Sequence, residues 1–271
     1  VYKRQLIVCE GRSFPLEIEY IESAKTHQPQ DIAHLVVGGI FKIVPKTSGH
    51  LLVFLPGLGE INKVKKYLET LEQFAEFTLS SLHGGISKSE QDEILKPSTR
   101  RKIILSTNIA QTSLTIDGVD GVVDTGLVKI LRNDPKFGIN RLELSFISKA
   151  SALQRAGRAG RQKPGYVVRL WSEEKQKSLK AFDSPDVARI DLSPYLLDLY
   201  SWGNGKTFEW YEKPSTAIVE TSVDLLESLG LICNDQITDD GRLVQQLPLH
   251  PRNAKVVIEF AKSGLHQMGC I

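Results

Sequence analysis

The chain has 271 residues, of which 41% are hydrophobic and 24% are charged, and its formal net charge is +2. This composition excludes a disordered protein, and the small net charge means that any nucleic-acid site must be a local patch. No apolar run reaches the roughly 18 residues of a transmembrane helix. The cysteines are far apart and lack metal-ligand spacing, so we expect no bound metal and free thiols in the cytoplasm.

Short apolar runs alternate with helical patterns in the first part of the chain. Strands are expected in HLLVFLP, FTLSSLHGG, RRKIILSTN, GVDGVVDTG and GYVVRLW. Between the first two, apolar residues recur on one face of a helix, namely Ile61, Val64, Leu68 and Leu71. Ser87 is placed to cap a second, shorter helix. This alternation predicts an α/β fold with a mostly parallel sheet, whose ligands bind at the carboxyl ends of the strands.

The pattern changes between Leu127 and Ser148, where two extended runs flank a turn rich in Asn, Asp, Pro and Gly. We expect a β-hairpin that protrudes from the sheet, and an ordinary surface connection is the alternative. After about Lys180 strands become scarce, and a helix is expected to start at Ser193 and Pro194. A second helix and two short extended runs follow it. Helices followed by a small β-wing suggest a winged-helix domain.

The stretch SALQRAGRAGRQKPG combines arginines, glutamines and glycines within a few residues. If a helix begins after Ser148, one of its faces carries Gln154, Arg158 and Arg161. Arg155 would point about 100° away from that face. Two guanidinium groups on one face suit a polyphosphate, and a third can hold a second anion or a carboxylate. An arginine finger places positive charge in this way, where negative charge grows during phosphoryl transfer. The alternative is a solvated basic turn.

These residues carry a family resemblance. QRAGRAGR resembles the last conserved motif of superfamily 2 helicases of the DEAH type, and STNIAQTSLTIDG is similar to the motif before it. LVFLPGLGEI and LHGGISKSEQ resemble two earlier motifs, and all four stand in the family's order. RLWSEE and LYSWG are most similar to bacterial HrpB-type members. The resemblance covers nearly the whole chain and implies an ATP-dependent RNA helicase, a nucleoside triphosphate hydrolase that moves along RNA.

The resemblance also implies a domain organisation. Residues 1–178 would be a second RecA-like domain, with a parallel sheet, helices on both faces and a β-hairpin insertion. Residues 179–247 would be a winged helix, and residues 248–271 the start of a helical bundle. The sequence has no D-E-x-H run and no P-loop, because Tyr200 stands where the Gly-Lys-Thr at 205–207 would need an earlier glycine. We therefore expect a piece of a longer protein, whose missing N-terminal RecA-like domain holds most of the Mg²⁺ contacts of ATP.

The resemblance implies the following residue roles. Gln154, Arg158 and Arg161 would act on the ATP phosphates, with Arg161 as the arginine finger. The remaining ATP contacts would come from Leu95, Ser113, Asp117 and Arg155. Asp117 would hydrogen-bond the ribose, and Ser113 would sense the nucleotide state. The RNA backbone would lie along Gly84, Thr107, Asn108 and Thr112.

Other interpretations stay open. Thr107, Asn108 and Asp117 also suit turns, and Gly84 can simply serve its loop. The family often has Glu at the position of Gln111, where Gln keeps the shape but loses the charge. An aromatic residue often stands where this chain has Leu95, so we expect weak discrimination among nucleoside triphosphates. The functional alternatives are a non-catalytic nucleic-acid-binding RecA-like module and an ordinary interaction domain.

Overall fold

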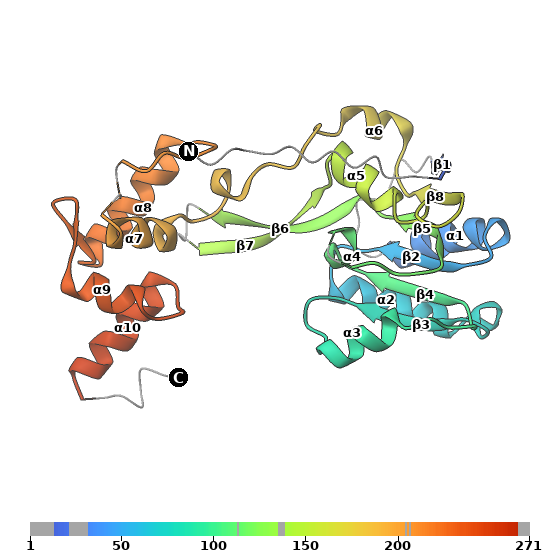
Figure 1. The fold of residues 1–271 in the computed structure, drawn as a ribbon, viewed down its shortest axis with the longest axis horizontal. Helices are drawn as coiled ribbons and strands as arrows, with labels where there is room; N and C mark the ends of the chain where they lie inside the picture. The colour runs from blue at the N-terminus through green and yellow to red at the C-terminus, as the bar shows by residue number, and fades with distance from the viewer. Residues whose placement is uncertain are drawn as a thin grey trace, which may run out of the picture. The chain divides into compact units, whose positions relative to one another are not determined.

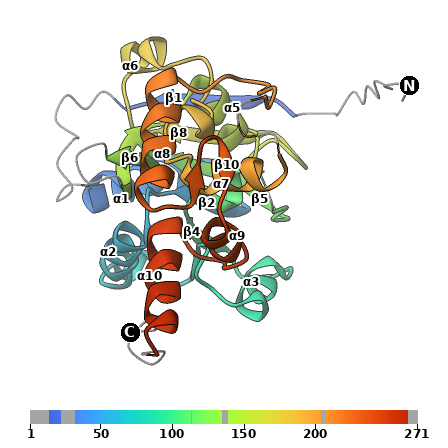
Figure 2. The same cartoon turned by 90° about the vertical axis from the view of Figure 1, so that its left-hand side faces the viewer.

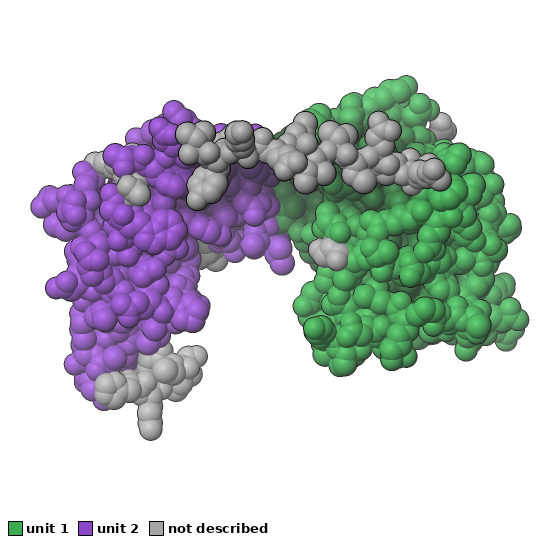
Figure 3. All heavy atoms as spheres, in the orientation of Figure 1, with its two compact units in different colours: residues 1–130, 144–183 green, residues 131–143, 184–271 purple. Residues whose placement is uncertain are grey.

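The structure is a computed structural model that describes residues 14–21, 32–112, 114–134, 139–203, 205 and 207–264. The chain divides into two compact units, which Figure 3 colours separately. The first unit comprises residues 1–130 and 144–183, and the second comprises residues 131–143 and 184–271. The first unit contains a parallel sheet, and the second is mainly helical.

Six parallel strands form the sheet of the first unit, in the order β1-β8-β5-β2-β4-β3 (Figure 1). Their bounds are Leu16–Tyr20 for β1, His50–Phe54 for β2, Thr78–Leu82 for β3, Lys102–Ser106 for β4, Val119–Asp124 for β5 and Gly165–Arg169 for β8. The strands β2, β4 and β5 are buried at every residue, and apolar residues dominate β2 and the middle of β4. The predicted parallel sheet is confirmed, and β1 is an additional edge strand that the sequence did not indicate.

Helices cover both faces of this sheet. They are α1 (Ile32–Ile43), α2 (Leu58–Glu69), α3 (Lys88–Leu95), α4 (Ile109–Thr112), α5 (Lys149–Ala156) and α6 (Glu173–Ser178), with short 3₁₀ turns at Val44–Lys46 and Glu72–Phe74. Leu51 and Val53 of β2 share a core with α1 and α2. Leu52 and Phe54 point to the other face. The core on that face includes Ala110 of α4 and Ala156, the last residue of α5.

Two helices begin at the serine caps that the sequence predicted. Ser87 caps α3 as predicted, and its backbone N–H donates to the carboxylate of Glu90 at 2.8 Å, which completes a capping box. Ser148 caps α5, also as predicted. The prediction that this helix continues through Arg161 is wrong, because α5 ends at Ala156 and Gly157 is its C-cap.

Tertiary packing explains why glycine follows this helix. A Cβ atom on Gly160 would lie 2.9 Å from the Leu16 Cδ2 atom and 3.0 Å from the Phe14 carbonyl oxygen. The Gly160 carbonyl accepts a hydrogen bond from the Phe14 N–H at 3.0 Å. The chain after α5 therefore packs directly against the segment that leads into β1, where a side chain does not fit.

The predicted β-hairpin is confirmed. Its strands β6 (Leu127–Asp134) and β7 (Ile139–Phe146) form a two-stranded sheet of their own. The base of the hairpin belongs to the first unit, and residues 131–143 belong to the second. The backbone N–H of Asn133 donates to the Arg189 carbonyl at 2.7 Å, and the Asp191 N–H donates to the side chain of Asn140 at 2.9 Å. These bonds fasten the hairpin within the second unit.

The second unit is built from helices and one small hairpin (Figure 2). Its elements are a 3₁₀ turn (Asp186–Ala188), α7 (Ser193–Ser201), α8 (Thr216–Ser228), β9 (Ile232–Cys233), β10 (Gln236–Ile237), α9 (Asp239–Gln245) and α10 (Pro251–Lys262). Gly203 follows α7 with φ +79°, a backbone conformation that ends the helix. Asn234 and Asp235 turn β9 into β10, both with positive φ. Within the stretch 233–251, where two short extended runs were predicted, the structure has the end of β9, the short strand β10 and then the helix α9, which was not predicted.

No described helix has the length and apolar character needed to cross a bilayer. Within the described ranges, no group of three or more His, Cys, Asp or Glu side chains is arranged to hold a metal ion. Cys233 is an exposed free thiol, and Cys9 and Cys270 lie outside the described residues.

Candidate functional site

The predicted RNA-contact residues leave two neighbouring strands at the same edge of the sheet. β3 and β4 pair in parallel with Leu82 opposite Ser106, so the next residues of both strands emerge together. The Thr107 N–H donates to the Leu82 carbonyl at 3.1 Å, which joins the two loops directly. Gly84 and Asn108 are exposed, and Thr107 is half-buried. The structure thus brings Gly84, Thr107 and Asn108 to one carboxyl edge.

The short helix α4 begins immediately after Asn108. Its first turn is closed by the Gln111 N–H, which donates to the Asn108 carbonyl at 2.9 Å. Thr112, the last residue of α4, is exposed. The predicted nucleotide sensor Ser113 lies outside the described residues. A Cβ atom on Gly84 would meet nothing within 4 Å, so packing does not require a glycine there.

Arg155 is the most enclosed arginine of the motif QRAGRAGR, residues 154–161. Its Nη1 atom donates to the Asp124 Oδ1 atom at 2.9 Å, and its Nε atom donates to the Gln111 Oε1 atom at 3.1 Å. The guanidinium lies over the Phe54 ring, 4.9 Å from the ring centre. From the sequence, this arginine was expected to hold either a second anion or a carboxylate. In the structure it binds the carboxylate of Asp124. Arg155 has no exposed surface for a nucleotide in this structure.

Arg158 fastens the loop after α4 to the end of α5. Its Nε atom donates to the Gln111 carbonyl at 3.0 Å, and its Nη1 atom donates to the Leu114 carbonyl at 2.5 Å. Burial lowers the pKa of Arg158 below its usual value, and the nearby charge of Arg161 lowers it further. An arginine keeps its charge after such a shift, so this side chain is a cation bound to backbone carbonyls.

Arg161 is exposed and makes one neutral contact, in which its Nη1 atom donates to the Thr115 hydroxyl at 2.9 Å. The next residue, Gln162, holds the predicted ribose contact in place. Its Nε2 atom donates to the Asp117 Oδ1 atom at 2.8 Å, and its Oε1 atom accepts from the Gly118 N–H at 2.9 Å. Gly118 has φ +77°, which explains the glycine. Gln162 was not predicted, although it directly follows the arginine motif.

Gln111 joins α4 to α5 and was noted from the sequence only as a departure from the family pattern. Its Nε2 atom donates to the Ser151 hydroxyl at 2.8 Å and to the Gln154 Oε1 atom at 3.0 Å. Gln154 is exposed near the end of α5. The structure therefore brings Gln154, Arg155 and Arg158 together around the helix α4, with Gln111 in contact with all three.

Leu95 is held by a separate anchor. It is the last residue of α3 and is half-buried. The buried Lys102 side chain donates from its Nζ atom to the carbonyls of Ile94 and Lys96, at 2.8 and 2.6 Å. A cation at the carboxyl end of a helix is favoured by the helix dipole. Lys102 thus fixes the backbone on both sides of Leu95, a role that the sequence did not reveal.

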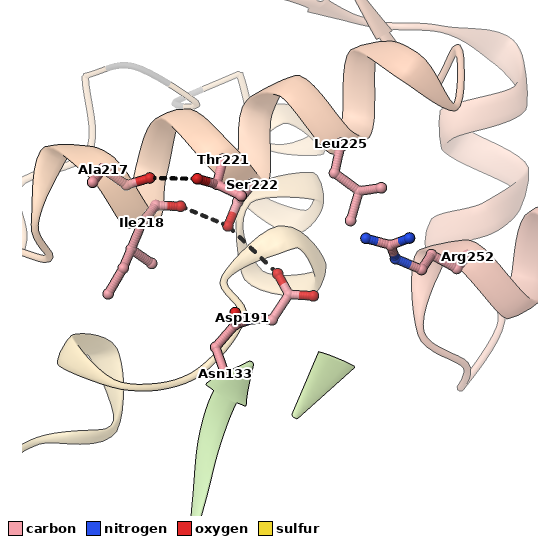
Figure 4. Close-up of a pocket in the computed structure, with 8 residues that line it drawn as sticks. All are labelled: Asn133, Asp191, Ala217, Ile218, Thr221, Ser222, Leu225 and Arg252. Atoms are coloured by element: carbon pink, nitrogen blue, oxygen red, sulfur yellow. Dashed lines mark hydrogen bonds between the residues drawn. The ribbon is translucent and has the colours of Figure 1, made fainter. Parts of the chain in front are cut away.

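The second unit contains a pocket of about 170 Å³ (Figure 4). One face of α8 lines it, together with Asn133, Asp191 and Arg252. The α8 residues are Ala217, Ile218, Thr221, Ser222 and Leu225. The Thr221 and Ser222 hydroxyls donate to carbonyls one turn earlier in α8, both at 2.8 Å. None of the predicted site residues lines this pocket.

Comparison with known proteins supports a helicase origin for these motifs. A family model described as the helicase conserved C-terminal domain matches residues 37–163. The ATP-dependent RNA helicase HrpB of Escherichia coli (strain K12) is 35% identical over 257 residues, covering 93% of this chain and 31% of HrpB. HrpA of the same organism is 33% identical over 270 residues, covering 96% of this chain and 21% of HrpA. The probable ATP-dependent RNA helicase DHX34 of Mus musculus is 36% identical over 270 residues, covering 93% of this chain and 23% of DHX34.

Solved structures agree with the sequence relatives. Two crystal structures of E. coli HrpB match with TM-scores of 0.79 and 0.82, at 35% and 34% identity. Each covers 92% of this chain, which corresponds to 31% and 32% of the HrpB chains. The chain thus spans about a third of HrpB and less of HrpA and DHX34. It carries the RecA-like helicase conserved C-terminal domain and is homologous, over most of its length, to the DEAH-type RNA helicases.

Proposed function

We propose that this chain is the C-terminal part of an ATP-dependent RNA helicase, which couples ATP hydrolysis to movement along RNA and to its unwinding. The observation that carries the proposal is the segment from Thr107 to Gly118. The segment begins at the sheet edge with the proposed RNA contacts. Its other end is hydrogen-bonded to the side chains of Arg158, Arg161 and Gln162. One short segment would therefore link the proposed RNA contacts to the proposed ATP contacts.

The exposed arginine suits a phosphate contact. Among the described residues the partner of Arg161 is the neutral Thr115 hydroxyl, so binding ATP would replace a hydroxyl contact with a stronger charge-assisted bond. Positive charge placed there would stabilise the negative charge that develops on the transferred phosphoryl group. Arg158 would join it by exchanging backbone carbonyls for phosphate oxygens. In this proposal Arg155 acts on ATP only indirectly, by holding Gln111 in place.

The remainder of the ATP site would come from a first RecA-like domain of the same protein. That domain would supply the P-loop and most of the contacts to Mg²⁺, and Asp117 of this chain would contact the ribose. Leu95 would cover the base by apolar contact. ATP binding and hydrolysis would then open and close the two RecA-like domains and drive the steps along RNA.

The proposed RNA contacts are made by small polar groups. Thr107, Asn108 and Thr112 offer hydroxyl and amide groups, and the exposed Gly84 lets a backbone approach closely. Such contacts hold phosphates and sugars without reading sequence. The β6–β7 hairpin would separate strands, and Leu142 and Leu144 of β7 present exposed apolar side chains for that purpose.

A non-catalytic nucleic-acid-binding module is the alternative. It is favoured by the internal partners of Arg155 and Arg158, which leave one arginine of the motif exposed. In that case the motif would stabilise the fold, and the chain would bind RNA without acting on ATP.

ATPase measurements on the full-length protein separate these functions. We expect Arg161→Ala to lower kcat by about 10³-fold or more while KM changes little, because a finger acts mainly in the transition state. Lys63→Ala, on an exposed position of α2, is the matched control and should leave kcat unchanged. A kcat for Arg161→Ala within about twofold of the wild type would exclude the finger role.

A further inference from the structure

A chain of hydrogen bonds with a fixed direction runs through the junction of α4 and α5. Asp183, Ser151, Gln111 and Gln154 follow one another along it, and Arg155 joins at Gln111. All of these residues belong to the first unit. The Asp183 carboxylate can only accept hydrogen bonds, and the Arg155 guanidinium can only donate them. These two fixed roles set the orientation of the amide groups of Gln111 and Gln154.

The first fixed end is Arg155. A guanidinium only donates hydrogen bonds, so the Gln111 atom that lies 3.1 Å from the Arg155 Nε atom must be the oxygen Oε1. The Gln111 Nε2 atom, with its two N–H groups, therefore faces Ser151 and Gln154.

The second fixed end is Asp183, and it gives the same orientation independently. The Ser151 hydroxyl lies 2.5 Å from the Asp183 Oδ2 atom, and a carboxylate accepts, so the single hydroxyl proton points there. The Ser151 oxygen must then accept its other bond, which comes from the Gln111 Nε2 atom at 2.8 Å. Two independent partners thus set the Gln111 amide the same way.

The orientation of Gln154 follows from that of Gln111. The second Gln111 N–H donates at 3.0 Å to Gln154, so the receiving atom must be the oxygen Oε1. The Gln154 Nε2 atom therefore points away from Gln111, and among the described residues nothing accepts a hydrogen bond from it. Because Gln154 is exposed, it presents an NH₂ donor group to any ligand at the end of α5.

We propose that Gln111 is a positioning residue that fixes Gln154 as a hydrogen-bond donor. On the proposed function, from which this inference starts, Gln154 would donate to a phosphate oxygen of ATP. Its oxygen faces Gln111, so the group that it turns toward the ligand is the NH₂ donor. In this proposal the orientation of Gln154 is set by Gln111, a residue that does not itself touch the ligand.

A glutamate at position 111 would reverse the arrangement. Its carboxylate can accept from the Arg155 Nε atom, but it has no N–H to donate. The Gln154 amide would then turn its Nε2 atom toward the carboxylate and its Oε1 atom outward, toward the phosphates. Gln111→Glu is nearly isosteric and gives Arg155 an anionic partner, while the single Ser151 hydroxyl proton would then serve either Asp183 or Glu at position 111.

A double-mutant cycle in the full-length protein tests this inference. ATPase kinetics and the affinity for a non-hydrolysable ATP analogue would be measured for Gln111→Glu, Gln154→Ala and the double variant. Each single variant should lose about tenfold in kcat/KM, the equivalent of one hydrogen bond to a charged group. Gln111→Glu should cause no further loss when Gln154 is already alanine, because Gln111 acts only through that side chain.

Two results would overturn the proposal. One is an equal loss from Gln111→Glu in both backgrounds, which would mean that it acts through Arg155 or the fold. The other is a Gln154→Ala variant as active as the wild type. In either case Arg161→Ala still reports on the proposed function, which fails separately if the wild-type full-length protein hydrolyses no ATP or if Arg161→Ala keeps its activity.

Discussion

Arg155 and Asp124 form an ion pair in which each side chain is 1% exposed. Removing one member leaves the other as a buried, uncompensated charge, which costs about 3–5 kcal/mol. We therefore expect Arg155→Met to lower the free energy of unfolding by about that amount, even though methionine fills a similar volume. Urea unfolding of the chain, followed by circular dichroism, measures the change.

Arg161→Met is the matched control for that measurement. Arg161 belongs to the same motif but is exposed, so its substitution should change the free energy of unfolding by no more than about 0.5 kcal/mol. Equal effects of the two variants would show that Arg155 is not the structural member of the motif.

At the scale of secondary-structure elements, one carboxylate ties α9 to α10. Asp240 accepts hydrogen bonds from the Nζ atoms of Lys255 and Lys262, both at 2.6 Å, and these bonds lower the pKa of Asp240 to about 2. A carboxyl whose folded pKa is depressed stabilises the fold above its unfolded pKa, and this stabilisation is lost as pH falls through the folded pKa. We expect the α9–α10 contact to weaken between about pH 4 and about pH 2.

Asp240→Asn should remove this pH-dependent contribution. The thermal unfolding midpoints of the variant and the wild type should differ at about neutral pH and should converge as the pH approaches about 2. Asp239→Asn is the control, because Asp239 makes no ion pair with any residue in the described part of the chain. A constant difference between Asp240→Asn and the wild type across this range would contradict the assignment.

Elements with local signals could be predicted from the sequence. The buried strands occur as continuous apolar runs, and Ser87 and Glu90 stand at capping-box spacing. The end of α5 could not be predicted, because Gly157 keeps a helical φ of −59° and the departure of the chain depends on Gly160 packing beside Leu16. The end of α5 therefore depends on contacts with residues that are distant in the sequence.

The candidate site shows the same limit. Its residue types were evident from the motif, but the partners that divide the arginines into buried and exposed groups are distant in sequence. Arg155 binds Asp124, which lies 31 positions earlier, and Arg158 binds carbonyls 47 and 44 positions earlier. Spacing set Arg155 apart from the face that carries Arg158 and Arg161, but it gave Arg158 and Arg161 the same role. The fold leaves Arg161 exposed and encloses the other two.

At the scale of the whole molecule, the proposed function separates binding from hydrolysis. The sequence contains no P-loop and no D-E-x-H run, and the chain spans 31% of HrpB. We expect the purified 271-residue chain to bind single-stranded RNA but not to hydrolyse ATP. Phosphate release and RNA fluorescence anisotropy, measured on one preparation, test both parts.

The salt dependence of that RNA binding distinguishes the functional alternatives. The net charge is only +2, so binding to phosphates must come from local contacts, each of which contributes about 0.7 to the slope of log affinity against log salt for single strands. A clear fall in affinity with added salt is therefore expected. Affinity that is independent of salt would favour an ordinary interaction domain. RNA-stimulated phosphate release above background would show that the chain carries a complete ATP site, and the proposed division of that site between two RecA-like domains would then be wrong.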